Sequence, residues 1–205
     1  MKSFMPLLVL AATLLSAPSA SAWRTLSDSC GGFHSLHWKL QPIPFALHTD
    51  LTEDQSQSDA AEAIGQSARA WHQSDNHLRF EEQPESSADV YIVEAGQYLG
   101  FRTPRYGPWS RTDNIIAFQR DGWPQALHGA RGITFAFYHR CDGEILQTDI
   151  IMNDTYTDWY VGEMPAGCES CFDIQNMVTH EFGHMIGLAH TDVPEATMNI
   201  CDQPG

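Results

Sequence analysis

The amino-acid sequence predicts an α+β fold, that is, a mixed α/β arrangement in which a twisted mixed sheet carries two long helices. Two observations support this class. Segments with strand and helix character follow in the order strand, helix, several strands, helix, and then a small irregular C-terminal part. The helical segments place apolar residues three and four positions apart, whereas the strands are short apolar runs between turn residues.

The predicted strands are bounded by Gly, Pro, Asn, Asp or Ser. They cover residues 43–48, 78–82, 89–94, 114–119, 132–139 and 145–152. The last two runs are separated by a turn containing Asp142 and Gly143, a pair that favours a β-hairpin. Residues 96–108 are rich in Gly and Pro and are predicted to form a surface loop.

Two helices are predicted between and after these strands. The first begins at Thr52-Glu53-Asp54-Gln55, a capping box whose side chains bond to the free N–H groups of a helix start, and ends near residues 74–76. Its apolar positions are Ala61, Ile64, Ala68 and Trp71. The second begins near Asp173, whose carboxylate can cap it, and runs through His180 and His184.

The amino terminus is typical of an export signal. Residues 4–15 are apolar but too few to span a bilayer, and Ala20-Ser21-Ala22 is a small-residue cleavage site. We predict a signal peptide over residues 1–22, an N-terminal segment over 23–37, and one folded domain over 38–205. The alternative is an apolar anchor that stays attached. Export predicts a secreted protein, extracellular or periplasmic, without membrane contact after the signal is removed.

The composition excludes some partners and suggests a redox compartment. The formal net charge is −15, and removing the signal with its single charge, Lys2, makes it −16, so we expect no binding to nucleic acid or anionic membranes. The five cysteines are Cys30, Cys141, Cys168, Cys171 and Cys201. In an exported protein they favour two disulfides and one leftover thiol, in any of about fifteen arrangements. A redox or metal role for Cys168 and Cys171 is the alternative.

A metal-ligand pattern lies on the second predicted helix. His180 and His184 are four residues apart and therefore face the same way, so that both imidazoles can bind one zinc ion. Glu181 follows about 100° further around the helix, beside the metal without being a ligand. Gly187 can end the helix in a conformation that other residues disfavour, which lets the chain return His190 as a third ligand. Three protein ligands leave a position for water, as in catalytic zinc sites.

A calcium site is a second metal hypothesis. The residues Asp149, Asn153, Asp154, Asp158 and Glu163 lie in and after one predicted strand. Their side chains offer the oxygen atoms that calcium binds. A solvated acidic loop is the commoner explanation of such a run.

The segment from His180 to His190 resembles the zinc-binding motif H-E-x-x-H-x-x-G-x-x-H of the metzincin peptidases. Met198 matches the methionine that these enzymes carry in a turn beneath the metal. Thr191 occupies the position where adamalysins carry Asp and astacins carry Glu. Ile200 occupies the position where astacins carry Tyr. The sequence from Trp38 to Met198 is most similar to matrixins, in their short bacterial secreted form.

The resemblance implies a sheet with two helices above the substrate cleft and a small irregular C-terminal subdomain below it. It also implies that substrate pairs with an edge strand of the sheet. The best match for that strand comprises Gly132, Ile133, Thr134, Phe135, Ala136, Phe137 and Tyr138. The implied activity is that of a secreted zinc metalloendopeptidase with Glu181 as general base, acting as a monomer on protein or peptide substrates. The alternatives are an inactive zinc-binding protein and an amidase acting on cell-wall peptides.

The chain departs from the matrixin pattern in three places. His128 and His139 lie where many matrixins bind a second zinc, but the surrounding loop pattern is missing, so we predict one zinc. Only 15 residues separate the predicted start, Trp23, from Trp38, too few for a helical propeptide. Cys30 either occupies the zinc as a latency switch or, as export favours, forms a disulfide. The chain also stops seven residues after Met198, from which we predict that the catalytic domain is incomplete at its C-terminus.

Overall fold

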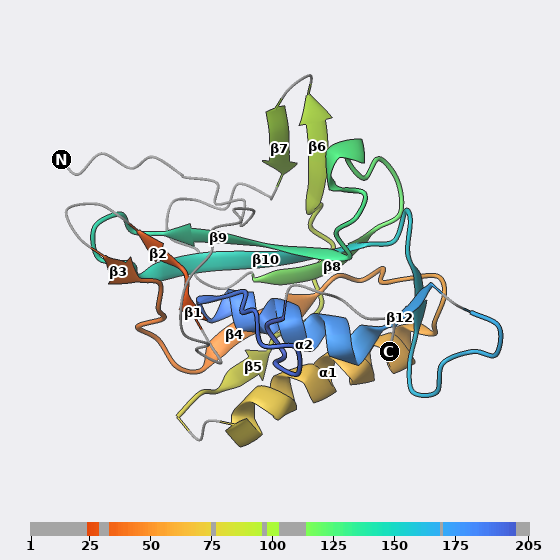
Figure 1. Cartoon of the computed structure of the whole chain (residues 1–205), viewed down its shortest axis with the longest axis horizontal. Coiled ribbons are helices and arrows are strands. Elements are labelled where there is room, and N and C mark those ends of the chain that lie inside the picture. Colours follow the sequence, from red (N-terminus) through yellow and green to blue (C-terminus); the bar gives the residue numbers. More distant parts are fainter. Residues whose placement is uncertain are drawn as a thin grey trace.

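The computed structural model describes residues 24–28, 33–74, 77–95, 98–102, 114–168 and 170–199. Its centre is a five-stranded sheet in the order β5-β4-β8-β10-β9 (Figure 1). The bounds of these strands are Phe80–Glu82 for β5, Ile43–Leu47 for β4, Ile115–Gln119 for β8, Ile145–Asn153 for β10 and Gly132–Tyr138 for β9. The first four are parallel to one another, and β9 is antiparallel to β10. The predicted mixed sheet is therefore confirmed.

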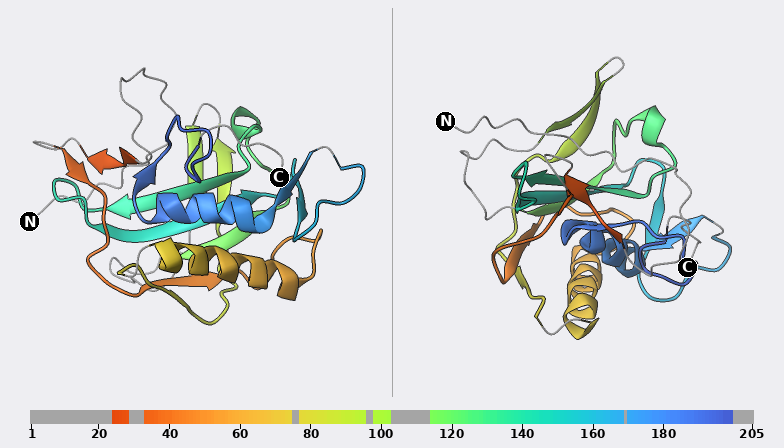
Figure 2. Two further views of the ribbon diagram at one scale, coloured as in Figure 1. Left: turned by 60° about the horizontal axis from the view of Figure 1, so that its bottom comes forward. Right: turned by 60° about the vertical axis from the view of Figure 1, so that its left-hand side comes forward.

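Two helices lie side by side and cover one face of this sheet, in front of the strands in the left view of Figure 2. Helix α1 spans Gln57–Ser74, and α2 spans Ile174–Met185. The core between sheet and helices includes fully buried Ile64 and Phe182, which pack with Phe45 from the sheet. The rings of Phe45 and Phe182 have centroids 5.4 Å apart, which fixes the rotation of α2 against the sheet.

A second, smaller core covers the other face of the sheet. It includes Ile92, Ile115, Trp123, Phe135 and Ile151. Strand β6, Tyr91–Ala95, leads from this core into an antiparallel hairpin with β7, Tyr98–Arg102. The single-turn helix η1, Gln125–Leu127, lies beyond the end of β8.

The remaining strands are short and pair outside the main sheet. They are β1 at Arg24–Thr25, β2 at Ser27–Asp28, β3 at His34–Ser35, β11 at Asp158–Tyr160, β12 at Cys171–Asp173 and β13 at Leu188–Ala189. Strand β1 pairs with β13, β2 with β3, and β11 with β12. No helix in the described ranges combines the length and apolar character needed to cross a membrane.

Two predicted boundaries are wrong. Helix α1 begins at Gln57 instead of residues 52–55, because Ser56 accepts the backbone N–H of Asp59 through its hydroxyl at 3.1 Å. The Thr52 hydroxyl instead donates to Asp154, 102 residues away, at 2.8 Å. The predicted loop over residues 96–108 contains β7 in its first part, and residues 103–108 lie outside the described ranges.

Several other predictions concern residues outside the described ranges. These are the signal peptide over 1–22, Cys30, Cys201 and Ile200. The disulfide prediction is confirmed for Cys168 and Cys171, which are bonded to each other. Cys141 is also disulfide-bonded.

Candidate metal centre

Helix α2 positions the first two histidines. As predicted, Asp173 caps the helix: its Oδ1 accepts the backbone N–H of Asn176 at 2.7 Å. Since Phe182 is buried in the core, the opposite side of the helix carries His180 and His184 toward β9. Both histidines are almost completely buried, so that little solvent competes for their ring nitrogens.

The chain turns at Gly187 and returns the third histidine. Helix α2 ends at Met185, and Gly187 has a φ of +94°, the left-handed conformation that favours glycine. A Cβ at this position would also collide with the carbonyl oxygen of Leu36. Two residues of β13 follow, and His190 then meets the other two histidines, as the sequence predicts.

The three imidazoles point their Nε2 atoms at one another. The Nε2 atom of His190 lies 3.1 Å from that of His180 and 3.1 Å from that of His184. Two zinc ligands at about 2.0–2.1 Å in a tetrahedral arrangement lie about 3.3 Å apart, close to this separation.

Backbone carbonyls select the tautomer in which these Nε2 atoms carry lone pairs. Nδ1 of His180 lies 2.7 Å from the carbonyl oxygen of Thr197, and Nδ1 of His184 lies 2.8 Å from that of Leu188. Because a carbonyl oxygen only accepts, each Nδ1 must carry the proton. Two nearby lone pairs repel, and a shared cation removes the repulsion. The donor set and its tautomers therefore fit zinc.

Burial keeps two of the ligands neutral. Desolvation, followed by the charge of His180, lowers the pKa of His184 to about 4. Desolvation also lowers the pKa of His190 to about 4. Neutral imidazole is the form that binds a metal, so both side chains are ready for zinc at neutral pH.

Glu181 lies beside the three histidines with its carboxylate against β9. The hydroxyl of Thr134 donates to Glu181 Oε2 at 2.6 Å. Gly132 leaves room for the same carboxylate, because a Cβ there would lie 2.9 Å from Oε1. Burial raises the pKa of the Glu181 carboxyl, while the charge of His180 and the bond from Thr134 oppose the rise. The contact with Thr134 was not predicted, since nothing in the sequence relates a strand residue to this glutamate.

Met198 packs against helix α2 at Gly183, between His180 and His184. Its side chain is buried, and a Cβ at Gly183 would collide with its sulfur, so the glycine inside the histidine motif allows this close approach. The backbone carbonyl of Met198 accepts the N–H of Thr191 at 2.8 Å, which ties the methionine turn to the residue after His190.

The predicted edge strand is the last strand of the sheet among the described residues. Strand β9 spans all seven predicted residues and pairs only with β10 within that part of the chain. Phe135 packs into the core behind the sheet, whereas Thr134, the neighbouring residue, contacts Glu181. The strand thus separates the rear core from the metal centre.

Two of the five residues in the calcium hypothesis use their side-chain oxygens elsewhere. Asp149 is fully buried, and its Oδ1 accepts the backbone N–H of Ile115 at 2.9 Å. The side-chain oxygen of Asn153 accepts the N–H groups of Thr155 and Tyr156 in its own turn. The side-chain oxygens of Asp149 and Asn153 are therefore already used for backbone bonds.

Asp154 and Asp158 instead line an acidic pocket together with Glu53, Asp54 and Arg120. The guanidinium of Arg120 binds both carboxylate oxygens of Asp50 at 2.8 Å and lies 3.5 Å from Asp154. This arginine supplies positive charge to the carboxylates.

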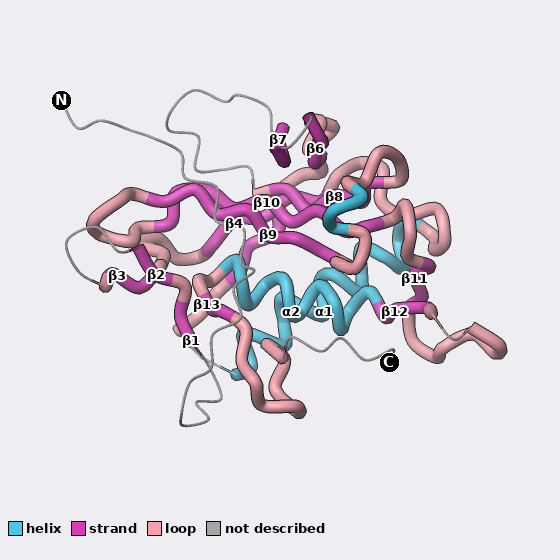
Figure 3. The backbone as a smooth tube through the Cα atoms, turned by 45° about the horizontal axis from the view of Figure 1, so that its top comes forward, coloured by secondary structure: helices cyan, strands magenta, loops and turns pink. Residues whose placement is uncertain are grey.

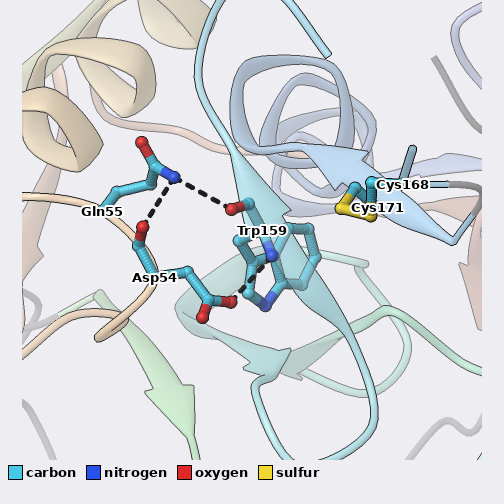
Figure 4. Close-up of a disulfide and its surroundings, with 5 residues drawn as sticks. All are labelled: Asp54, Gln55, Trp159, Cys168 and Cys171. Atoms are coloured by element: carbon cyan, nitrogen blue, oxygen red, sulfur yellow. Dashed lines mark hydrogen bonds between the residues drawn. A yellow bond between two sulfur atoms is a disulfide. The ribbon is translucent and has the colours of Figure 1, made fainter. Parts of the chain in front are cut away.

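Side chains from the segment before α1 bond to the backbone of β11 next to this pocket (Figure 4). Asp54 accepts the backbone N–H of Trp159 at 2.8 Å, and Gln55 donates to the carbonyl of the same tryptophan at 3.0 Å. Cys168 and Cys171 lie nearby with Asp158, but their sulfurs are joined in the disulfide and are not free thiolate ligands.

The ionisation of Asp154 makes the stability of the folded protein depend on pH, and this dependence can be measured. Desolvation raises its pKa to about 6, above the value of about 3.9 in an unfolded chain. The stability that it contributes is therefore complete below pH 4 and lost as the pH rises through about 6. We expect Asp154→Asn to raise the free energy of unfolding at pH 7.5 by about 1–2 kcal/mol relative to the unmodified protein, and to have little effect at pH 4.

Urea unfolding of both proteins at the two pH values measures this difference. A variant that is less stable at pH 7.5, with a loss that appears only when calcium is added, would show instead that the ionised carboxylate binds a cation.

Comparison with known proteins agrees with the geometry. No curated protein matches this chain. The sequence model of the matrixin family matches residues 37–203, which include the sheet, both helices, the three histidines and Met198. This match covers most of the sequence, and the histidines meet as a zinc site requires. The chain therefore belongs to the matrixin family of zinc metalloendopeptidases.

Proposed function

We propose that this matrixin is a secreted endopeptidase in which Glu181 is the general base and β9 binds the substrate backbone. The observation that carries the proposal is the contact between these two parts, since Thr134 of β9 bonds directly to the Glu181 carboxylate. A peptide added to the outer edge of β9 would therefore pass beside the base and the three histidines.

The bound zinc, Glu181 and the residues of β9 have separate roles in the proposed hydrolysis. When bound, zinc polarises the scissile carbonyl and makes water acidic enough to be a nucleophile near neutral pH. Glu181 accepts the proton of the attacking water and delivers it to the leaving amine. Thr134 holds the carboxylate in place during both transfers, and Gly132 leaves the space that the carboxylate occupies.

Secretion and a monomeric state complete the proposal. Matrixins are generally secreted, and the disulfide between Cys168 and Cys171 is typical of proteins from oxidising compartments. The ligands and the base all come from one chain, so a monomer suffices for activity. The resemblance to short bacterial forms stays a prediction.

A digest of a peptide library tests this function. We expect cleavage at internal bonds, mapped by mass spectrometry, that stops when zinc is chelated and returns when zinc is restored. An amidase for cell-wall peptides would leave the library intact and cleave murein fragments. Absence of turnover on both substrates by zinc-loaded protein would support the inactive zinc-binding alternative.

A further inference from the structure

The first described residues of the chain pair directly with the loop that carries the third histidine. Strand β1 is antiparallel to β13, with Arg24 opposite Ala189 and Thr25 opposite Leu188. The N–H of Leu26 donates to the carbonyl of Gly187 at 2.7 Å. Figure 3 shows β1 and β13 side by side below the sheet. Since β13 ends one residue before His190, this pairing fixes the approach to a metal ligand.

The following stretch packs against the same turn. The N–H of Leu36 donates to the carbonyl of Leu26 at 2.8 Å, and Leu36 is 4% exposed. Its carbonyl lies so close to Gly187 that no other residue type fits there. Two residues later, Trp38 donates its ring N–H to the carbonyl of Met185, at the end of α2, at 2.8 Å.

The same segment is also bound to the β9–β10 turn. The buried carboxylate of Asp28 accepts the N–H of Cys141 at 2.6 Å. His37 donates its backbone N–H to Gly143 at 2.9 Å and accepts that of Ile145 at 2.8 Å. A Cβ at Gly143 would lie 2.5 Å from the carbonyl oxygen of Ser35. Residues 24–28 and 33–37, here called the amino-terminal strap, therefore link the strand-turn side of the site to the histidine loop.

We propose that the amino-terminal strap positions His190 and is a permanent part of the active enzyme. Within the described residues, β1 is the only strand partner of β13. The N–H of Leu26 also binds the carbonyl of Gly187, which lies after the end of α2. Without the strap, that carbonyl loses its bond and the two residues before His190 lose their pairing. The loop must then be ordered by the metal itself, which weakens zinc binding. The inference rests on the zinc site but not on peptide cleavage.

A pair of substitutions at one residue isolates the backbone contact. Leu26→Pro removes the N–H that donates to Gly187, whereas the control Leu26→Ala keeps it and shortens only the side chain. We expect Leu26→Pro to weaken zinc affinity about tenfold in a chelator competition, within the range for groups that support metal ligands, and Leu26→Ala to change it little. Equal zinc affinities for folded Leu26→Pro and Leu26→Ala would overturn the proposal.

A second measurement keeps the proposal testable if Leu26→Pro does not fold. The active protein is purified, its N-terminus is identified by mass spectrometry, and its zinc affinity is measured. We expect an N-terminus ahead of Arg24. Fully active protein that starts at or after Trp38, with unchanged zinc affinity, would show that the strap is a removable segment. Because zinc affinity is measured without substrate, failure to find a cleaved peptide leaves the comparison of Leu26→Pro with Leu26→Ala unaffected.

Discussion

Replacing Glu181 by glutamine is expected to abolish nearly all peptidase activity while leaving zinc bound. Glutamine has the shape of glutamate, and its side-chain oxygen can still accept the bond from Thr134, which is 2.6 Å long in the present structure. It cannot accept a proton from water at neutral pH. Because a positioned general base contributes about 10²–10⁴-fold to a rate, we expect kcat/KM to fall roughly 10³-fold.

The measurement combines turnover of an internally quenched peptide with zinc determination on the same samples. Thr134→Val is the matched control, because it removes only the hydroxyl that orients the carboxylate and keeps the base. We expect it to lower kcat by about tenfold or less, with little change in KM. Turnover near the normal rate in zinc-loaded Glu181→Gln would exclude Glu181 as the base.

The metal centre was largely predictable because its geometry is local. His180 and His184 are brought together by the spacing of one helix, and the position of Glu181 follows from the same rotation. The turn at Gly187 depends on the conformational freedom of one residue, and its φ of +94° has the sign that the sequence predicts. The hairpin of β9 and β10 was similarly predictable from its turn residues.

The errors occurred where distant residues compete with a local pattern. The hydroxyl of Thr52 matches a helix cap, but it donates to Asp154 instead, and the helix starts later at the next suitable cap. The predicted calcium ligands are close in sequence, yet Asp149 is used by Ile115 on a neighbouring strand. These partners lie 34 and 102 residues away, beyond the reach of any short motif.

The amino-terminal strap shows the same limit at the active site. The residues before Trp38 gave no sequence signal of a strand that pairs with the histidine loop. The pairing of the strap with β13 joins residues more than 160 positions apart, from Thr25 to Leu188. Gly143 and Gly187 are signals of this packing in retrospect, since each makes room for a strap carbonyl as well as a turn. The sequence alone predicts a turn at each glycine, but it does not show which part of the chain packs against that turn.

Replacing His190 by alanine is expected to reduce zinc affinity by at least about 100-fold and to remove peptidase activity. The remaining pair, His180 and His184, stays four residues apart on α2 and can still hold the metal weakly. His128→Ala is the control, because this exposed histidine lies outside the group of three. Zinc content after chelator competition distinguishes the variants, and a His190→Ala protein that keeps stoichiometric zinc would remove this residue from the ligand set.

Added imidazole sharpens the assignment. His190 is less buried than the two helical histidines, and its ring lies at the end of β13, so alanine leaves a space that a free imidazole can enter. We expect millimolar imidazole to restore part of the zinc binding and turnover of His190→Ala. The same addition should not restore Glu181→Gln, in which the missing group is a carboxylate. Rescue of both variants would mean that imidazole acts as a general buffer catalyst, whereas rescue of His190→Ala alone identifies its ring as a metal ligand.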